Sequence, residues 1–313
     1  MPRPIPDSAR SHRKSGVLVN PPSSLLGCTN AVLAGTARHY HVPEFEGPLS
    51  IKSVTSGSAV WEIPGRAFTI HENTCLLLNN RQHYAMTIES ARPTSTWCFF
   101  FARDFVEDVF RTRTVPVQAL LDAAYPATFA PLHFVECIEP QHTPFFAEFR
   151  RFQRNLDAGR LNGPGAEAHL FRLATALLVQ HQHLERAVSR LPTIRAATRG
   201  ELFRRVLRGR DFLLSSLSGP TPALEEVARV ACLSPYHFHR SFRAAFGEAP
   251  HRYLVRYRLA RAAHLLRTTG HTVTEICMET GFESPASFSS LFHRCFHASP
   301  VRYRREKPAV ALR

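Results

Sequence analysis

The sequence predicts an α+β protein, in which a strand-rich N-terminal domain precedes an all-helical C-terminal domain. Three observations predict this class. Between Leu25 and about Phe101, short runs of alternating apolar and polar residues are separated by turn residues, as in small barrels and sandwiches. From Ala102 onward, apolar residues recur at helical spacing. Within residues 203–313, two similar helical segments follow one another at an offset of 50 residues.

The expected elements of the N-terminal region follow from these periods. Strands are expected at Leu49–Val54, Ala59–Ile63 and Trp97–Phe101. Helices are expected at Ala102–Arg113, Pro144–Leu156 and about Glu167–Arg190. The resulting segments are a disordered tail (1–20), an N-terminal domain (21–190, with a barrel at 21–135 and helices at 136–190), a linker (191–202) and a C-terminal domain (203–313).

Composition excludes several classes of protein. The 313 residues contain no apolar run near the roughly 20 residues that a membrane span needs, and Met1–Asn20 lacks the apolar stretch of a secretory signal. The seven cysteines are scattered and no CxxC pair occurs, so neither a disulfide framework nor a structural zinc site is expected. We therefore expect reduced thiols in a cytoplasmic protein that contacts no membrane.

The charge balance points to a polyanionic partner. The net charge is +14, and residues 201–313 carry 18 Lys and Arg against 9 Asp and Glu. Almost all of the basic residues are arginines, which suit bidentate contacts with phosphate and guanine. Genome composition explains an arginine bias equally well, so charge alone does not identify the partner.

The first C-terminal segment has the pattern of a helix-turn-helix unit. Leu224–Ala231 forms a short amphipathic helix with a turn after it. Ser234 and Pro235 then open a second helix, because serine caps a helix N-terminus and proline fits its first turn. The expected core stripe of the second helix consists of Phe238, Phe242 and Phe246.

The same landmarks return 50 residues later. Val273–Thr280 is the short helix, and Ser284 with Pro285 opens the second one. The repeated aromatic residues are Phe288, Phe292, Phe296 and Tyr303, the last of which matches Tyr253. This agreement indicates a tandem duplication.

The face opposite the phenylalanines is expected to contact DNA, because the second helix of such a unit enters the major groove. The candidates in the first unit are Tyr236, His239, Arg240 and Arg243; those in the second unit are Ala286, Ser289, Ser290, His293 and Arg294. The second set is short or weakly basic, so base recognition is expected mainly from the first unit, with Arg240 on guanine.

A helix at Tyr253–Leu266 is expected to connect the two units. At about 1.5 Å per residue it spans roughly 20 Å, and with its flanking turns it sets the two reading helices about one turn of DNA apart. Arg258 in this helix has two interpretations, a structural ion pair or a contact with DNA.

These residues resemble the AraC/XylS family of bacterial transcriptional regulators over about Leu224–Arg304. The resemblance rests on Ile276-Cys277, Gly281-Phe282, Ser287-Phe288, Phe292, Ser299-Pro300 and Tyr303-Arg304, and on Arg258, Ala262 and Leu265-Leu266 in the connecting helix. Two departures are visible: Cys277 replaces the usual alanine, and His297 stands where a glycine usually ends the second reading helix.

The resemblance implies a regulator of double-stranded promoter DNA, more often an activator, that is not an enzyme and uses no cofactor. It also implies that RNA polymerase is a partner and that the protein forms a homodimer. Its N-terminal domain is then a small-molecule sensor or dimerisation domain, often a cupin-like barrel.

The N-terminal domain offers candidates for both of those roles. The residues chosen for an effector pocket are Trp61, His83, Tyr84, Trp97 and Phe99. The residues chosen for a dimer helix are Leu170, Leu173, Leu177 and Leu184, which fall near heptad a and d positions. Packing of these leucines on their own domain explains the pattern equally well.

Two alternatives stay open at this point. One is a ligand-independent architectural factor, in which the N-terminal domain only pairs subunits. The other is a metal-dependent cupin enzyme fused to a DNA-binding module, because His39, His41 and Glu46 have the spacing of a cupin metal triad. Pro43 and Gly47 disfavour that motif, and no second histidine element follows at suitable spacing, so no metal site is expected.

Overall fold

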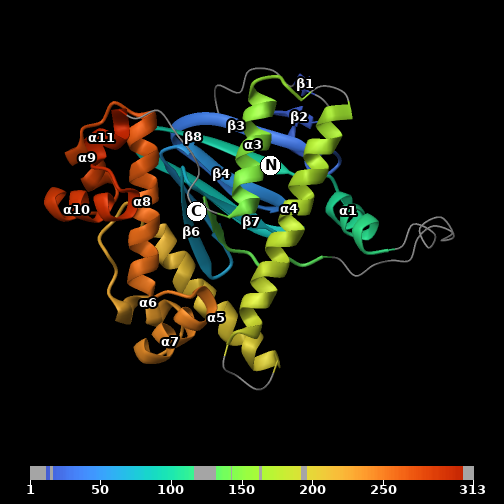
Figure 1. The fold of residues 1–313 in the computed structure, drawn as a ribbon. Coiled ribbons are helices and arrows are strands. Elements are labelled where there is room, and N and C mark those ends of the chain that lie inside the picture. Colours follow the sequence, from blue (N-terminus) through green and yellow to red (C-terminus); the bar gives the residue numbers. More distant parts are fainter. Residues whose placement is uncertain are drawn as a thin grey trace. The chain divides into compact units, whose positions relative to one another are not determined.

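The computed structural model divides into two compact units, Met1–Ala187 and Val188–Arg313 (Figure 1). The residues that it describes are 12–14, 17–115, 132–141, 143–161, 164–191 and 196–305. The N-terminal unit combines a sheet with helices, and the C-terminal unit is helical throughout its described part, so the predicted α+β class is confirmed. Among the described helices, none has both the length and the apolarity that a membrane crossing requires.

One mixed sheet dominates the N-terminal unit. Its described strands are β1 (His12–Lys14), β2 (Val17–Val19), β3 (Ala31–Gly47), β4 (Ser50–Ser56), β5 (Ser58–Ile63), β6 (Arg66–His71), β7 (Thr74–Leu78), β8 (Gln82–Phe100) and β9 (Ile138–Pro140). Hydrogen bonds join them in the order β1-β2-β3-β8-β4-β7-β9, and β5 pairs with both β6 and β8. The long strands β3 and β8 are antiparallel from Ala31 opposite Phe100 to Gly47 opposite Gln82.

The sheet is open, which corrects the expected cupin-like barrel. A barrel closes only when its last strand pairs with its first. Among the described strands, β9 pairs only with β7, β6 only with β5 and β1 only with β2. Register shifts in β3, after Ala37 and after Val42, bend its long pairing with β8 without closing the sheet. The expected barrel also included residues 116–131, which lie outside the described residues.

Two segment boundaries differ from the predicted ones. Val17–Val19, inside the expected disordered tail, is a strand, because pairing with β3 satisfies its backbone hydrogen-bonding groups. Helix α5 begins at Ala196, inside the expected linker at 191–202. The division between the two units falls after Ala187, within helix α4.

Helices cover one face of the N-terminal sheet (Figure 1). They are α1 (Phe105–Thr114), α3 (Pro144–Asp157) and α4 (Pro164–Ser189). Helix α3 begins at Pro144 because the Thr143 side chain accepts a hydrogen bond from the Phe146 amide. Phe149 and Phe152 of α3 meet Trp97 of β8 edge to face, with ring centroids 5.6 and 6.3 Å apart.

The leucine stripe of α4 belongs to this same core. Leu170, Leu173 and Leu177 are at most 3% exposed and pack with the phenylalanines of α3. Leu184 is also buried, beside Leu77 of the sheet. Of the two interpretations of the stripe, packing on its own domain is the one that the geometry supports. These side chains therefore offer no exposed seam to a partner helix.

The C-terminal unit contains two helix pairs joined by a long helix. Its described helices are α5 (Ala196–Ser215), α6 (Leu224–Val230), α7 (Pro235–Phe246), α8 (Pro250–Thr268), α9 (Val273–Glu279), α10 (Pro285–Phe296) and α11 (Pro300–Arg305). The side chains of Ser234 and Ser284 accept hydrogen bonds from the third residue of α7 and of α10. The predicted caps therefore form in both repeats.

The aromatic cores of the two repeats match contact by contact. Phe242 and Tyr253 lie edge to face at 5.3 Å between ring centroids, and Phe292 and Tyr303 do so at the same distance. Phe238, Phe242, Phe288 and Phe292 are all fully buried. The prediction that these phenylalanines are core, rather than part of a recognition surface, is confirmed.

The two reading helices also end alike. Gly247 closes α7 with φ +80°, and His297 closes α10 with φ +55°. His297 stands where a glycine is usual, but its backbone adopts the left-handed conformation and its amide bonds to the His293 carbonyl at 2.8 Å. A residue with a Cβ pays a steric cost there that glycine avoids.

Candidate nucleic-acid interface and ligand cavity

Helix α7 presents one polar face and one buried face. Tyr236 is 77% exposed, Arg240 and Arg243 are exposed, and His239 is half-buried. These positions recur every three or four residues, so they share a face that points away from the phenylalanine stripe. Neither arginine forms an ion pair with any described residue. The first-unit candidates therefore form one exposed, cationic surface.

Helix α10 offers the corresponding face with smaller side chains. Ala286, Ser290, His293 and Arg294 are exposed, and Ser289 is half-buried. Short side chains allow a close approach of the helix backbone, but they supply fewer hydrogen bonds to base edges than the tyrosine and arginines of α7. The two repeats thus share a core and differ in their exposed faces.

Arg258 of α8 is structural, and it is neither an ion pair nor an exposed contact. It is 2% exposed. Its Nη1 donates to the Thr221 hydroxyl at 2.7 Å and to the Gly281 carbonyl at 2.8 Å. Its Nη2 donates to the carbonyls of Ser216 and Gly219 at 2.9 and 2.6 Å. The guanidinium thus ties the turn between α9 and α10 to the loop between α5 and α6.

The turn that Arg258 holds requires a glycine. Gly281 has φ +74°, and a Cβ there would lie 2.5 Å from the Gly219 carbonyl oxygen. The same Cβ would lie 2.7 Å from Cζ of Arg258. Arg261, one turn further along α8, is buried too and donates to the Glu279 carbonyl at 2.8 Å. Two arginines of the connecting helix are therefore occupied inside the protein and unavailable to phosphate.

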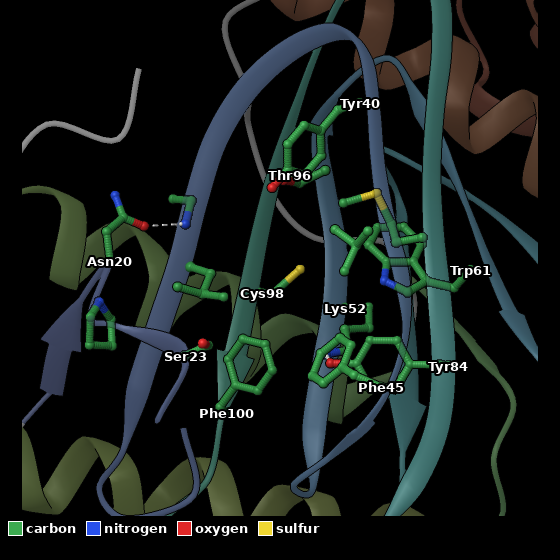
Figure 2. A pocket seen from close by; sticks show the side chains of 15 residues that line it. Asn20, Ser23, Tyr40, Phe45, Lys52, Trp61, Tyr84, Thr96, Cys98 and Phe100 are labelled. Carbon is green, nitrogen blue, oxygen red and sulfur yellow. Dashed lines mark hydrogen bonds between the residues drawn. The ribbon is translucent and has the colours of Figure 1, made fainter. Parts of the chain in front are cut away.

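A cavity opens on the sheet face opposite helices α3 and α4 (Figure 2). Its volume is about 70 Å³, and the atom-free space between the lining residues, including the opening to solvent, is about 640 Å³. The lining comes from β3, β4, β5 and β8 and from the segment before β3. It includes Asn20, Tyr40, Phe45, Lys52, Trp61, Tyr84, Thr96, Cys98 and Phe100.

Two of the five residues chosen for a pocket line this cavity. Trp61 and Tyr84 do, whereas Trp97 and Phe99 lie on the other face of β8, in the core with α3. The choice of Trp97 and Phe99 was wrong because alternate residues of a strand face opposite sides of the sheet. His83 is half exposed and lies by Glu44 and Glu46, with nitrogen-to-oxygen distances of 3.5 and 3.8 Å.

Lys52 is the lining residue that the sequence alone did not identify. Its side chain is 1% exposed, and its Nζ donates to Tyr84 Oη at 2.5 Å. Nζ also lies over the rings of Tyr84 and Phe100, 4.1 and 3.9 Å from their centroids. Burial lowers the pKa of Lys52 to about 7. A lysine in the alternating run Leu49–Val54 was the available signal, because that run was expected to be half-buried.

The residues of the alternative metal triad do not form a site. His39 and His41 are exposed, whereas Tyr40 and Val42 between and after them line the cavity. His41 Nδ1 lies 3.1 Å from the Thr87 hydroxyl. Within the described part of the chain, no cluster of three His, Cys, Asp or Glu side chains is arranged to hold a metal ion.

Comparison with known proteins shows which type of domain the C-terminal unit contains. A family model described as a helix-turn-helix domain matches residues 227–306. The transcriptional activator RhaS of Salmonella arizonae is 43% identical over 86 residues. The C-terminal unit therefore contains a helix-turn-helix domain of the AraC type. The matched part of this AraC-type domain spans 28% of the present chain and 31% of the length of RhaS.

Two solved structures align with the chain at low TM-scores. An AraC-type regulator from Chromobacterium violaceum is 24% identical, covers 35% of this chain and 94% of its own, and has a TM-score of 0.30. ToxT from Vibrio cholerae, bound to an unsaturated fatty acid, is 12% identical, covers 88% of this chain and 94% of its own, and has a TM-score of 0.34.

The AraC-type domain accommodates Cys277 at the position where the family pattern has an alanine. The thiol is fully buried beside Ile276 and Phe288, and its Sγ lies 3.5 Å from the Phe282 carbonyl oxygen. A thiol in this position behaves as a small apolar side chain with a weak donor. The substitution therefore leaves the packing of α9 on α10 intact.

Proposed function

We propose that this protein is a sequence-specific transcriptional regulator that binds duplex promoter DNA and acts as an activator. The observation that carries the proposal is the exposed face of α7. Tyr236, Arg240 and Arg243 stand there opposite a phenylalanine core, and the arginines have no acidic partner among the described residues. Such a face suits the major groove, where arginine bonds guanine and phosphate. The similarity to RhaS, which is a transcriptional activator, supports the assignment.

In this proposal α7 and α10 occupy successive major grooves on one face of the DNA. The side chains on α7 and α10 that face bases or phosphates are the nine exposed and half-buried residues described above. Helix α8 acts as the spacer between the two reading helices, and Arg258 and Arg261 fix its packing rather than contact DNA.

The N-terminal domain supplies regulation in the same proposal. Its cavity receives a small effector, and the protein acts as a homodimer that recruits RNA polymerase in the bacterial cytoplasm. The dimer surface does not include the α4 leucines, because these side chains are buried in the N-terminal unit.

A comparison of two arginine substitutions tests the DNA contact. Arg240→Ala removes a side chain of the reading face, whereas Arg208→Ala removes an exposed arginine of α5 and the same charge. Sites are first found by sequencing genomic DNA fragments captured by the full-length protein. The affinity of each variant is then measured for the best site and for random DNA of equal length.

We expect Arg240→Ala to weaken binding to the selected site about 10- to 100-fold, with a much smaller loss on random DNA. Arg208→Ala should change both affinities by a similar small factor. An equal loss on both DNAs for Arg240→Ala would reduce Arg240 to a phosphate contact. A chain that enriches no sequence at all would overturn the proposed function.

A further inference from the structure

One buried cation faces the cavity, and no described carboxylate neutralises it. Lys52 projects from β4 into the space between β3, β5 and β8 (Figure 2). Its described partners are the Tyr84 hydroxyl, the rings of Tyr84 and Phe100, and the Cys98 thiol, with which it interacts electrostatically. An ammonium group out of water and without an anion is costly to the fold. A cation kept in such a place is well suited to an anion that arrives from outside.

The groups around Lys52 are mainly hydrogen-bond donors. The Tyr84 oxygen accepts from Lys52, which leaves its own hydroxyl proton to donate elsewhere. The indole nitrogen of Trp61 is turned toward the cavity in Figure 2, and no described residue accepts its proton. Lys52 and Tyr84 therefore place two donors side by side in the cavity, Trp61 adds a third to its lining, and none of the described lining residues is Asp or Glu. A carboxylate, which only accepts, complements this set.

The remaining lining fixes the charge and the size of the ligand. Lys52 is the only Lys, Arg or His among the described lining residues, so the site matches one negative charge rather than a phosphate dianion. The walls beyond the donors are apolar and include Val42, Phe45, Met86 and Phe100. A cavity volume of about 70 Å³ limits the enclosed part of the ligand to a small body.

We propose that the cavity binds a small monocarboxylic acid with an apolar body, whose carboxylate pairs with Lys52 and accepts from Tyr84 and Trp61. The apolar body lies against Phe45, Met86 and Phe100. That this ligand is the effector rests on the proposed function, whereas its binding to the cavity does not.

Matched pairs of acid and amide test the ligand class. Full-length protein is titrated by calorimetry with phenylacetate, hexanoate, octanoate and benzoate, and with the primary amide of each. The two members of a pair have nearly the same shape and differ in charge. We expect at least one acid to bind at least tenfold more tightly than its amide. Equal affinities within every pair, or no binding by any acid, would overturn the proposal.

Lys52→Met tests the role of the ammonium. Methionine keeps most of the length of the side chain and removes its charge, so the fold should persist. The preference for the acid over its amide should fall to about one, while the affinity for the amide is kept. A variant that retains the full preference would place the carboxylate elsewhere.

The two tryptophans give a readout on protein with Lys52 intact. Trp61 lines the cavity and Trp97 lies on the opposite face of the sheet. The ligand should change the fluorescence of the wild type and of Trp97→Phe, but not that of Trp61→Phe. A response that persists in Trp61→Phe would move the ligand out of the cavity.

DNA binding by the same preparations separates this inference from the proposed function. If an acid binds at Lys52 but changes neither promoter affinity nor reporter output, the ligand class holds and the effector role fails. If the protein selects a promoter sequence but binds none of the acids, the ligand inference fails and the DNA-binding function stands.

Discussion

Arg258 donates from Nη1 to the carbonyl oxygen of Gly281 at 2.8 Å, across 23 residues of sequence. The same guanidinium reaches two carbonyls of the loop between α5 and α6. One buried side chain thereby fixes the turn of the second helix-turn-helix unit against the segment that precedes the first. This contact holds the turn that precedes α10, although Arg258 is too deeply buried to meet DNA itself.

Replacing Arg258 should therefore damage stability rather than recognition. Arg258→Ala leaves several buried carbonyls without donors, and we expect the free energy of unfolding of the AraC-type domain to fall by about 3 kcal/mol or more. Arg252→Ala, at an exposed position of the same helix, should change it by less than about 0.5 kcal/mol. Urea unfolding of the full-length variants measures both. A near-neutral Arg258→Ala would show that water replaces the guanidinium.

Stability should depend on pH through Lys52. Burial lowers its pKa from 10.5 in the unfolded chain to about 7 in the folded protein. Between these values the unfolded chain binds more protons, so the free energy of unfolding gains from this group as the pH rises, by at most about 1.4 kcal/mol per pH unit. Below pH 7 the whole cost of burying the charge is present.

Lys52→Met isolates that contribution. The variant should be more stable than the wild type at pH 7, and its advantage should shrink by up to about 3 kcal/mol by pH 9.5. Burial raises the pKa values of the Cys98 thiol and the Tyr84 hydroxyl, and because both proteins carry these groups, their contributions largely cancel in the difference. Denaturant unfolding at both pH values gives the comparison, and a constant difference between the two proteins would contradict it.

A glycine should improve the end of α10. His297 holds φ +55° at an exposed position, where glycine has no steric cost. His297→Gly should raise the free energy of unfolding of the domain by about 1 kcal/mol. Gly247→Ala, at the equivalent end of α7, should lower it by a similar amount, since its φ is +80°. Thermal unfolding of the pair tests the prediction, and shifts of the same sign would refute it.

The two halves of a binding site should be read unequally. Base changes in the half that faces α7 should cost about 1–3 kcal/mol each, because Tyr236 and Arg240 reach base edges. Changes in the half that faces α10 should cost less, because Ala286 and Ser289 are short. Affinities for every single-base variant of the selected site give the profile. Equal costs across both halves would show that the exposed faces do not determine the sequence preference.

Much of the C-terminal domain was predictable because its signals are local. The Ser-Pro helix starts and the phenylalanine spacing act within one or two turns, and all of them appear in the structure at the expected residues. The left-handed conformation of His297 was not predictable, since the side chain alone does not favour it. The role of Arg258 was not predictable either, because its partners lie 23 to 42 residues away.

The N-terminal domain was less predictable because its fold depends on which strands pair with one another. Alternation in β8 shows that two faces exist but not which one meets helices, and so Trp97 and Phe99 were assigned to the wrong face. Whether a run of strands closes depends on the pairing of distant edges, which no local pattern encodes. The buried lysine was present in a run expected to be a strand, but its environment only emerges when β4 lies beside β8.

The alternation of side chains along β8 limits the kinds of mutation that the protein can accumulate in this strand. Thr96, Cys98 and Phe100 face the cavity, while Trp97 and Phe99 hold the helices. Point mutations at the first set can retune what the cavity accepts while the scaffold survives. A single inserted or deleted codon in this stretch would exchange the two faces, and would remove chemical selectivity and structural support together. Diversification here must therefore proceed by substitution, one side of the strand at a time.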